Sequence, residues 1–118
     1  MPTFSLRPKT IFAVAAIAVA SAGLAAAPAL AKETADMHQQ ARYGGKTCFV
    51  THSHHGEGNM PSRKGAERAA IRRWTFFTKW EYGPLWGSYA KARGKRMNCQ
   101  RSGSRWTCMT DAYPCRGR

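Results

Sequence analysis

The stretch "KRMNCQRSGSRWTCMTD" (residues 95–111) places two strand-like runs on either side of Ser-Gly-Ser. If Gly103 and Ser104 form a two-residue type II′ turn, counting outward from the turn brings Cys99 opposite Cys108. The alternation of an antiparallel ladder makes this a non-hydrogen-bonded pair, in which side chains come closest, as a disulfide requires. The stretch therefore predicts a β-hairpin crosslinked by Cys99–Cys108.

The other two cysteines of the chain, Cys48 and Cys115, are then left to form the second disulfide, Cys48–Cys115. Four cysteines allow three pairings, and spacing alone does not exclude the other two. A zinc site is the alternative use of these cysteines, but no two of them form a C-x-x-C pair. An even number of cysteines behind an export signal favours disulfides.

The N-terminus has the organisation of such a signal. Arg7 and Lys9 precede a long alanine-rich apolar run, and "ALA" at residues 29–31 offers the small residues of a cleavage site. We predict a cleaved signal peptide over residues 1–31 and a periplasmic or secreted protein. An uncleaved membrane anchor is the alternative, because the run is just long enough to span a bilayer. No other stretch of the sequence is long and apolar enough to span a bilayer, so no transmembrane segment is expected after processing.

After the signal, we expect a polar, flexible leader over residues 32–45 and a strand over "KTCFVTH" (residues 46–52). The following "SHHGEGNMPSRKG" (residues 53–65) contains glycines, proline, Asn and Ser without apolar periodicity, which is typical of a loop. Ser62 is a candidate N-cap for the helix that follows.

Residues 66–82 have the strongest helical pattern in the chain. Apolar positions recur at spacings of four, four and three, and Glu81 follows after four more: Ala66, Ala70, Trp74, Phe77, Glu81. Tyr-Gly-Pro ends this helix, and a second, shorter helix is predicted over residues 84–94.

The predicted order is strand, long helix, short helix and hairpin. This order indicates a single α+β domain over residues 46–118, with a small antiparallel sheet and the long helix packed on one face. A domain of this size buries only about 60% of the surface of its unfolded chain, so disulfide staples are expected.

The run over residues 70–115 resembles small secreted bacterial proteins of unknown function. In that pattern an aromatic helix leads to Tyr-Gly, a Trp, a Cys–Trp–Cys hairpin and a final Pro-Cys, and the matching positions are Tyr82-Gly83, Trp86, Cys99, Trp106, Cys108 and Pro114-Cys115. The resemblance implies a fold module and no activity.

Charge is the main functional signal. The net charge is +13, and loss of Arg7 and Lys9 with the signal lowers it to +11. Such an excess favours an anionic partner: an envelope polyanion or surface, nucleic acid or an acidic protein. The alternative is that the charge serves solubility or reflects a lineage-wide basic bias. The expected basic face consists of Arg68, Arg72, Arg73, Lys79, Arg93, Lys95 and Arg96. Trp80 or Trp86, if exposed, could add stacking on bases or sugars.

The stretch "THSHHGEGN" (residues 51–59) holds three of the four histidines. His52 and His54 would point the same way along a strand, and His55 is a candidate third ligand for Zn, Cu or Ni, with His38 or Glu57 nearby. The alternative is a polar loop whose histidines respond to pH.

Catalytic signatures are weak by comparison. Two imidazoles could serve a nuclease as general acid and base, but no nucleophile elbow, phosphate loop or carboxylate pair accompanies them. We predict a non-enzymatic, cofactor-free binding protein for an anionic partner, with metal binding by the His52–His55 segment as the alternative. The sequence does not predict its oligomeric state.

Overall fold

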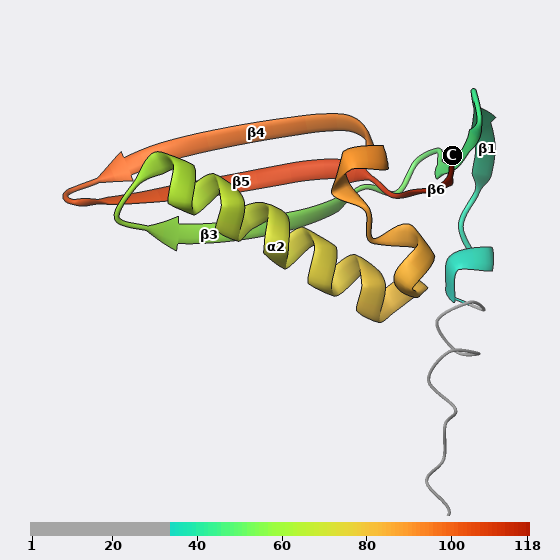
Figure 1. Cartoon of the computed structure of the whole chain (residues 1–118), viewed down its shortest axis with the longest axis horizontal. Coiled ribbons are helices and arrows are strands. Elements are labelled where there is room, and N and C mark those ends of the chain that lie inside the picture. Colours follow the sequence, from blue (N-terminus) through green and yellow to red (C-terminus); the bar gives the residue numbers. More distant parts are fainter. Residues whose placement is uncertain (1–33) are drawn as a thin grey trace, which may run out of the picture.

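The computed structural model describes residues 34–118, and the predicted signal peptide lies outside this range. The chain has an α+β fold with one long helix, α2, and two small antiparallel sheets (Figure 1). The elements in order are β1 (Gln40–Tyr43), β2 (Lys46–Phe49), β3 (His54–Met60), α2 (Arg63–Tyr82), the 3-10 turns η1 (Pro84–Trp86) and η2 (Tyr89–Lys91), β4 (Arg93–Ser102), β5 (Arg105–Tyr113) and β6 (Cys115–Gly117).

The strands divide into sheets with the orders β1-β2-β6 and β3-β5-β4, where one sheet was expected. The split follows from β3, which pairs with β5 along its whole length and leaves β2 to pair with β1 and β6. In Figure 1, α2 crosses one face of the β3-β5-β4 sheet, and the small sheet lies at the opposite end from the β4–β5 turn.

The predicted hairpin is confirmed in register and crosslink. Cys99 lies opposite Cys108 in the ladder between β4 and β5, and the two form a disulfide. Gly103 has a φ of 59°, as the first position of a II′ turn requires. Cys48–Cys115 joins β2 to β6 as expected. Two disulfides indicate an oxidising, extracytoplasmic environment.

The predicted loop over residues 53–65 is wrong for its first half, which forms β3. Its burial alternates with a period of two, and Gly56 and Gly58 are buried against α2. A Cβ atom on Gly56 would lie 2.5 Å from the backbone nitrogen of Trp74, and one on Gly58 would lie 2.6 Å from that of Ala70. These glycines therefore allow close strand–helix approach.

The helix begins three residues earlier than predicted, and Ser62 is its N-cap: the side-chain oxygen accepts a hydrogen bond of 3.1 Å from the Gly65 N–H. From Ala66 onward its buried positions keep a spacing of four, so Thr78 and Tyr82 continue the line from Trp74. Phe77, which the apolar spacing placed in line with Trp74, is instead 37% exposed.

Two further boundaries differ. The leader expected over residues 32–45 contains β1, which pairs with β2 from Gln40 to Tyr43. The short helix predicted over residues 84–94 is instead the pair η1 and η2 followed by the start of β4. Trp86 of η1 is nevertheless buried, in a cluster with Phe49 and Tyr82. In the described residues 34–118, no helix has both the length and the apolar character needed to cross a membrane.

Candidate functional site

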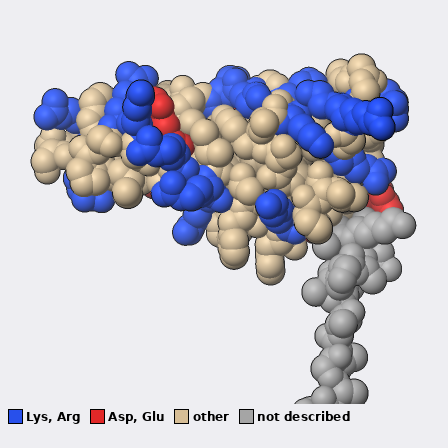
Figure 2. Space-filling view, viewed as in Figure 1, with Lys and Arg blue, Asp and Glu red and all other residues tan. Residues whose placement is uncertain are grey.

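Four of the seven predicted anion-binding residues lie on α2 and are exposed: Arg68, Arg72, Arg73 and Lys79. Within residues 34–118, the only ion pair formed by a lysine or arginine joins Arg63 to Glu67. The four cations on α2 therefore have no carboxylate partner in this part of the chain. Figure 2 shows Lys and Arg side chains spread along this face of the molecule, with few acidic ones between them.

Arg93 is not part of this exposed set. Its guanidinium lies 4.3 Å from the ring centre of Tyr43 and 4.5 Å from that of Tyr113. The Nη2 atom donates to the carbonyl oxygens of Phe49 and Val50, at 3.2 and 3.3 Å. Arg93 thereby connects the end of β2 to the start of the β4–β5 hairpin, which is a structural role.

The last two predicted residues lie away from α2's outer face. Lys95 is exposed and donates to the carbonyl of Ala90. Arg96 pairs in register with Asp111, which in turn lies opposite His55. A groove of about 690 Å³ on the sheet face that α2 does not cover is lined by His55, Arg96 and Asp111. The predicted basic face is therefore divided between two surfaces.

Large apolar side chains are exposed next to the cations of α2. Phe76 is 63% exposed, Trp80 is 74% exposed, and Leu85, just beyond the helix, is 69% exposed. The rings of Phe76 and Phe77 are 5.4 Å apart, and the guanidinium of Arg73 lies 5.0 Å from the Phe77 ring centre. We call Phe76, Phe77, Trp80 and Leu85 the aromatic patch.

A second candidate site gathers three of the four histidines between β2, β3 and the end of α2. His38 and His52 are stacked with ring centres 4.3 Å apart, and the His52 and His54 rings are 5.6 Å apart. His54 Nε2 lies 2.9 Å from both Glu81 Oε2 and Tyr82 Oη. We call His38, His52, His54 and Glu81 the histidine cluster. Glu81, which the sequence pattern placed on the apolar stripe, is thus a polar partner of His54.

Burial determines the electrostatics of this cluster. It lowers the pKa of His54, although the carboxylate of Glu81 acts in the opposite direction. Burial, followed by the nearby His52, lowers the pKa of His38. The pKa of Tyr82 is raised by burial and by Glu81. His38 and His54 therefore favour the neutral imidazole, which is also the metal-binding form.

The histidines predicted to act together do not all meet. His52 and His54 are neighbours in the cluster, but His55 follows the alternation of β3 to the uncovered sheet face. His38 takes its place from a segment before β1. Across residues 34–118, no three donor atoms of the histidine cluster lie within 4.8 Å of one another, so its arrangement is not a preformed metal site.

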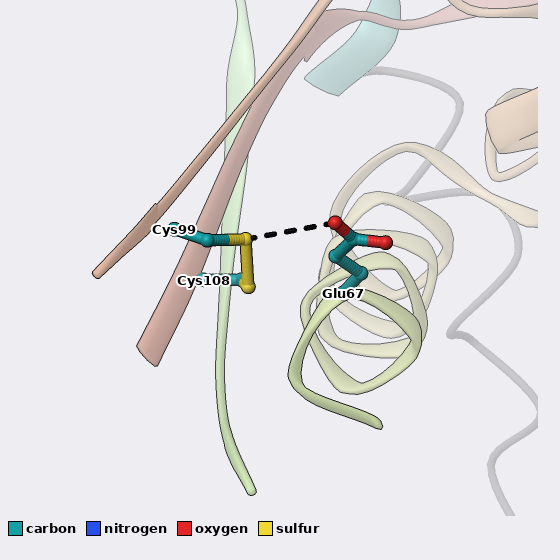
Figure 3. A group of neighbouring side chains, drawn as sticks. All are labelled: Glu67, Cys99 and Cys108. Carbon is teal, nitrogen blue, oxygen red and sulfur yellow. Dashed lines mark hydrogen bonds between the residues drawn. A yellow bond between two sulfur atoms is a disulfide. The ribbon is translucent and has the colours of Figure 1, made fainter. Parts of the chain in front are cut away.

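Glu67, Cys99 and Cys108 are the one group of potential ligands that does come this close within the described residues (Figure 3). The two sulfurs are bonded to each other, which removes the thiolates that bind metals. The Glu67 carboxylate lies 3.8 Å from the sulfur of Cys99, and because that sulfur carries no hydrogen, this is a packing contact. The group therefore has a structural role.

Of the aromatic patch, only Trp80 was predicted from the sequence as a candidate exposed side chain. A signal for it exists: Arg68, Arg72, Phe76 and Trp80 are each four residues apart and so share one line along a helix. The shift from spacing four to three at Phe77 obscured it. No family model matches the chain, and searches of curated proteins and of solved structures find no similar protein.

Proposed function

We propose that this protein is an exported, non-enzymatic binding protein that engages an anionic partner through the outer face of α2. One observation carries the proposal: Arg68, Arg72, Arg73 and Lys79 are exposed on one helix, and none of them has an ion-pair partner among residues 34–118. The cations repel one another, and an anionic partner relieves that repulsion. Arginine's planar fork of donors fits phosphate and carboxylate groups.

Export is part of the proposal. The two disulfides agree with an oxidising compartment, and the N-terminal segment has the pattern of a cleaved signal. A periplasmic and a secreted location fit these features equally.

The test uses a short DNA duplex as a soluble polyanion of known charge spacing. Each phosphate contact contributes about 0.9 to the slope of log affinity against log salt. Replacing Arg68, Arg72 and Arg73 together with Gln should lower that slope by about two to three and weaken binding at moderate salt by roughly tenfold or more.

The matched control is a variant with the same change in net charge at other exposed sites, with Arg42, Arg96 and Arg101 replaced by Gln. If α2 is the binding face, this control should lose much less affinity than the helix variant. Equal losses in both variants would mean that only net charge matters. No measurable binding at low salt to the duplex or to any other anionic probe would overturn the proposal.

A second candidate function is metal binding by the histidine cluster. It is favoured by the stacking of His38 on His52 beside His54, which gathers three imidazoles in a partly buried position. Imidazole is a ligand for Zn, Cu and Ni. Rotation of the His38 and His52 rings is required to direct three nitrogens at one ion, because no three donor atoms of the cluster converge as they stand.

Calorimetric titration with Zn²⁺, Cu²⁺ and Ni²⁺ tests this candidate. Stoichiometric binding that is independent of salt, lost in His52→Ala and kept in His55→Ala would support it, because His55 faces away from the cluster. Weak binding that is equal in the unchanged protein, His52→Ala and His55→Ala would contradict it.

A further inference from the structure

The aromatic patch defines the chemistry of the anionic partner more closely. We propose that the partner is an anionic lipid surface, with Phe76, Phe77, Trp80 and Leu85 entering its interfacial layer while the cations of α2 contact the headgroups. This inference rests on the proposed anion binding and adds the class of partner.

The arrangement along α2 has the two parts that such a surface requires. Arg68 and Arg72 precede Phe76 and Trp80 on one helical line, so charge lies toward the N-terminal half and apolar area toward the C-terminal half. Arg73 and Lys79 flank the aromatic side chains. Interfacial protein segments combine Lys and Arg with Trp, Phe and Leu in this way.

The exposed apolar area is not required by the fold. The core line of α2 consists of Ala66, Ala70, Trp74, Thr78 and Tyr82, and it packs on the opposite side of the helix. Phe76 at 63%, Trp80 at 74% and Leu85 at 69% exposure therefore have no covering element among residues 34–118. In Figure 2, uncharged side chains project along the lower rim of this face between Lys and Arg side chains. Contiguous exposed apolar area rimmed by charge is typical of an interaction surface.

The geometry favours lipid over nucleic acid as the partner. Base stacking uses open aromatic faces that lie along a strand. Here the Phe76 and Phe77 rings meet at 74°, and the Arg73 guanidinium lies over the Phe77 ring. Leu85 offers area but no ring. Insertion into an interfacial layer uses apolar area in any orientation.

The charge also disfavours a second copy of the chain as the partner of this face. Two such faces brought together would oppose the same arginines, which have no ion-pair partner among residues 34–118. An anionic lipid surface is complementary in charge, and each Lys or Arg near it adds roughly a fivefold gain in affinity.

The experiment compares binding of the oxidised, processed protein to four probes: phosphatidylcholine vesicles, vesicles that also contain phosphatidylglycerol, the DNA duplex and single-stranded DNA. Sedimentation of the vesicles measures partition, and tryptophan fluorescence reports insertion. Of the four tryptophans, Trp74 and Trp86 are buried, Trp106 is partly buried and Trp80 is 74% exposed, so a blue shift that disappears in Trp80→Ser reports this side chain. We expect binding to the anionic vesicles, with such a shift, and little binding to phosphatidylcholine alone.

The deciding variant is Phe76→Ser with Trp80→Ser, which leaves the core line intact. It should weaken partition to anionic vesicles by at least about tenfold, because each large apolar side chain contributes about that much when buried. Duplex binding should change by less than about twofold, since the bases of a duplex are covered. Met109→Ser is the matched control: Met109 is 49% exposed on the uncovered sheet face, and its loss should leave partition unchanged.

The outcomes separate this inference from the function on which it depends. Duplex binding without vesicle binding, or vesicle binding that the aromatic variant leaves unchanged, would overturn the lipid inference and keep anion binding. A loss in the aromatic variant that is larger for single-stranded DNA than for vesicles would indicate base stacking instead. Failure to bind any anionic probe would overturn both proposals.

Discussion

Replacement of Gly56 by alanine tests the packing on which the whole site depends. Gly56 lies in β3 directly beneath α2, and a Cβ atom there would sit 2.5 Å from the Trp74 nitrogen and 2.9 Å from its Cβ, and closer still to the carbonyl oxygen of Ala70. Ordinary contacts of this kind are about 3.5 Å. The strand and the helix must therefore separate by roughly 1 Å, and because backbone atoms face the methyl group, no side-chain rotation relieves the clash.

Overpacking of this kind costs about 1–3 kcal/mol, and the backbone location places Gly56→Ala near or above the upper value. Alanine recovers about 0.5–1 kcal/mol relative to glycine through its lower conformational freedom when unfolded. We expect a net loss of about 2–3 kcal/mol, which for a domain of this size is a fall in melting temperature of roughly 10–20 °C.

The assay is urea or thermal unfolding with both disulfides intact. Glu57→Ala is the matched control, because Glu57 is the next residue of β3 and is exposed on the opposite side. Its free energy of unfolding should stay within about 0.5 kcal/mol of the unchanged protein. If Gly56→Ala were as stable as Glu57→Ala, β3 would not lie against α2 as closely as the structure has it.

Three other predictions concern the disulfides, the histidines and Arg93. Loss of the Cys48–Cys115 bridge, which spans 67 residues, should lower the free energy of unfolding by about 4 kcal/mol in the loop-entropy model. Loss of the hairpin disulfide, which spans nine residues, should lower it by about 2.7 kcal/mol. The urea midpoint should therefore be lower in the variant with Cys48 and Cys115 replaced by Ala than in the one with Cys99 and Cys108 replaced. Because the pKa values of His38 and His54 are lowered in the folded protein, the unfolded chain binds more protons below about pH 6.5. The urea midpoint should therefore fall as pH decreases from 7 to 5. A midpoint that rises over this range would contradict the burial of these imidazoles. Arg93→Gln should lower the free energy of unfolding by about 2 kcal/mol through loss of its cation–π and carbonyl contacts, yet change duplex affinity by less than about twofold; an affinity loss as large as that of Arg72→Gln would return Arg93 to the binding face.

The β4–β5 hairpin could be predicted because its register depends on adjacent residues. A glycine at the first turn position sets the pairing, and the Cys99–Cys108 disulfide confirms it. The strand β3 could not be predicted in this way. Gly56 and Gly58 have low strand propensity, and their place in a sheet depends on the backbone of α2 between Ala66 and Trp74, which follows them in the chain and is not visible in the strand's own pattern.

The candidate sites show the same limit. The anion-binding arginines of α2 followed from composition and helical periodicity, but Arg93 has the same chemistry and a different environment. Its guanidinium packs against the rings of Tyr43 in β1 and Tyr113 in β5, which are 70 residues apart in the sequence. His38 joins His52 only because β1 pairs with β2, so no spacing within the histidine-rich segment indicates the cluster.

The side chains of the aromatic patch are not core residues displaced to the surface. The N-terminal half of α2 meets the sheet through glycine and alanine, where the close approach leaves no room for a ring. The C-terminal half already places Trp74 and Tyr82 inside, with Phe49 and Trp86 around Tyr82. Phe76 and Trp80 lie on the side of the helix away from both regions, so no repacking of this fold buries them. A surface of that kind lowers solubility unless charge offsets it, and here it adjoins arginines that have no carboxylate partner within residues 34–118. The same cations that keep the patch in solution also direct it toward an anionic surface, and this dual effect is why charge and aromatic variants must be tested separately.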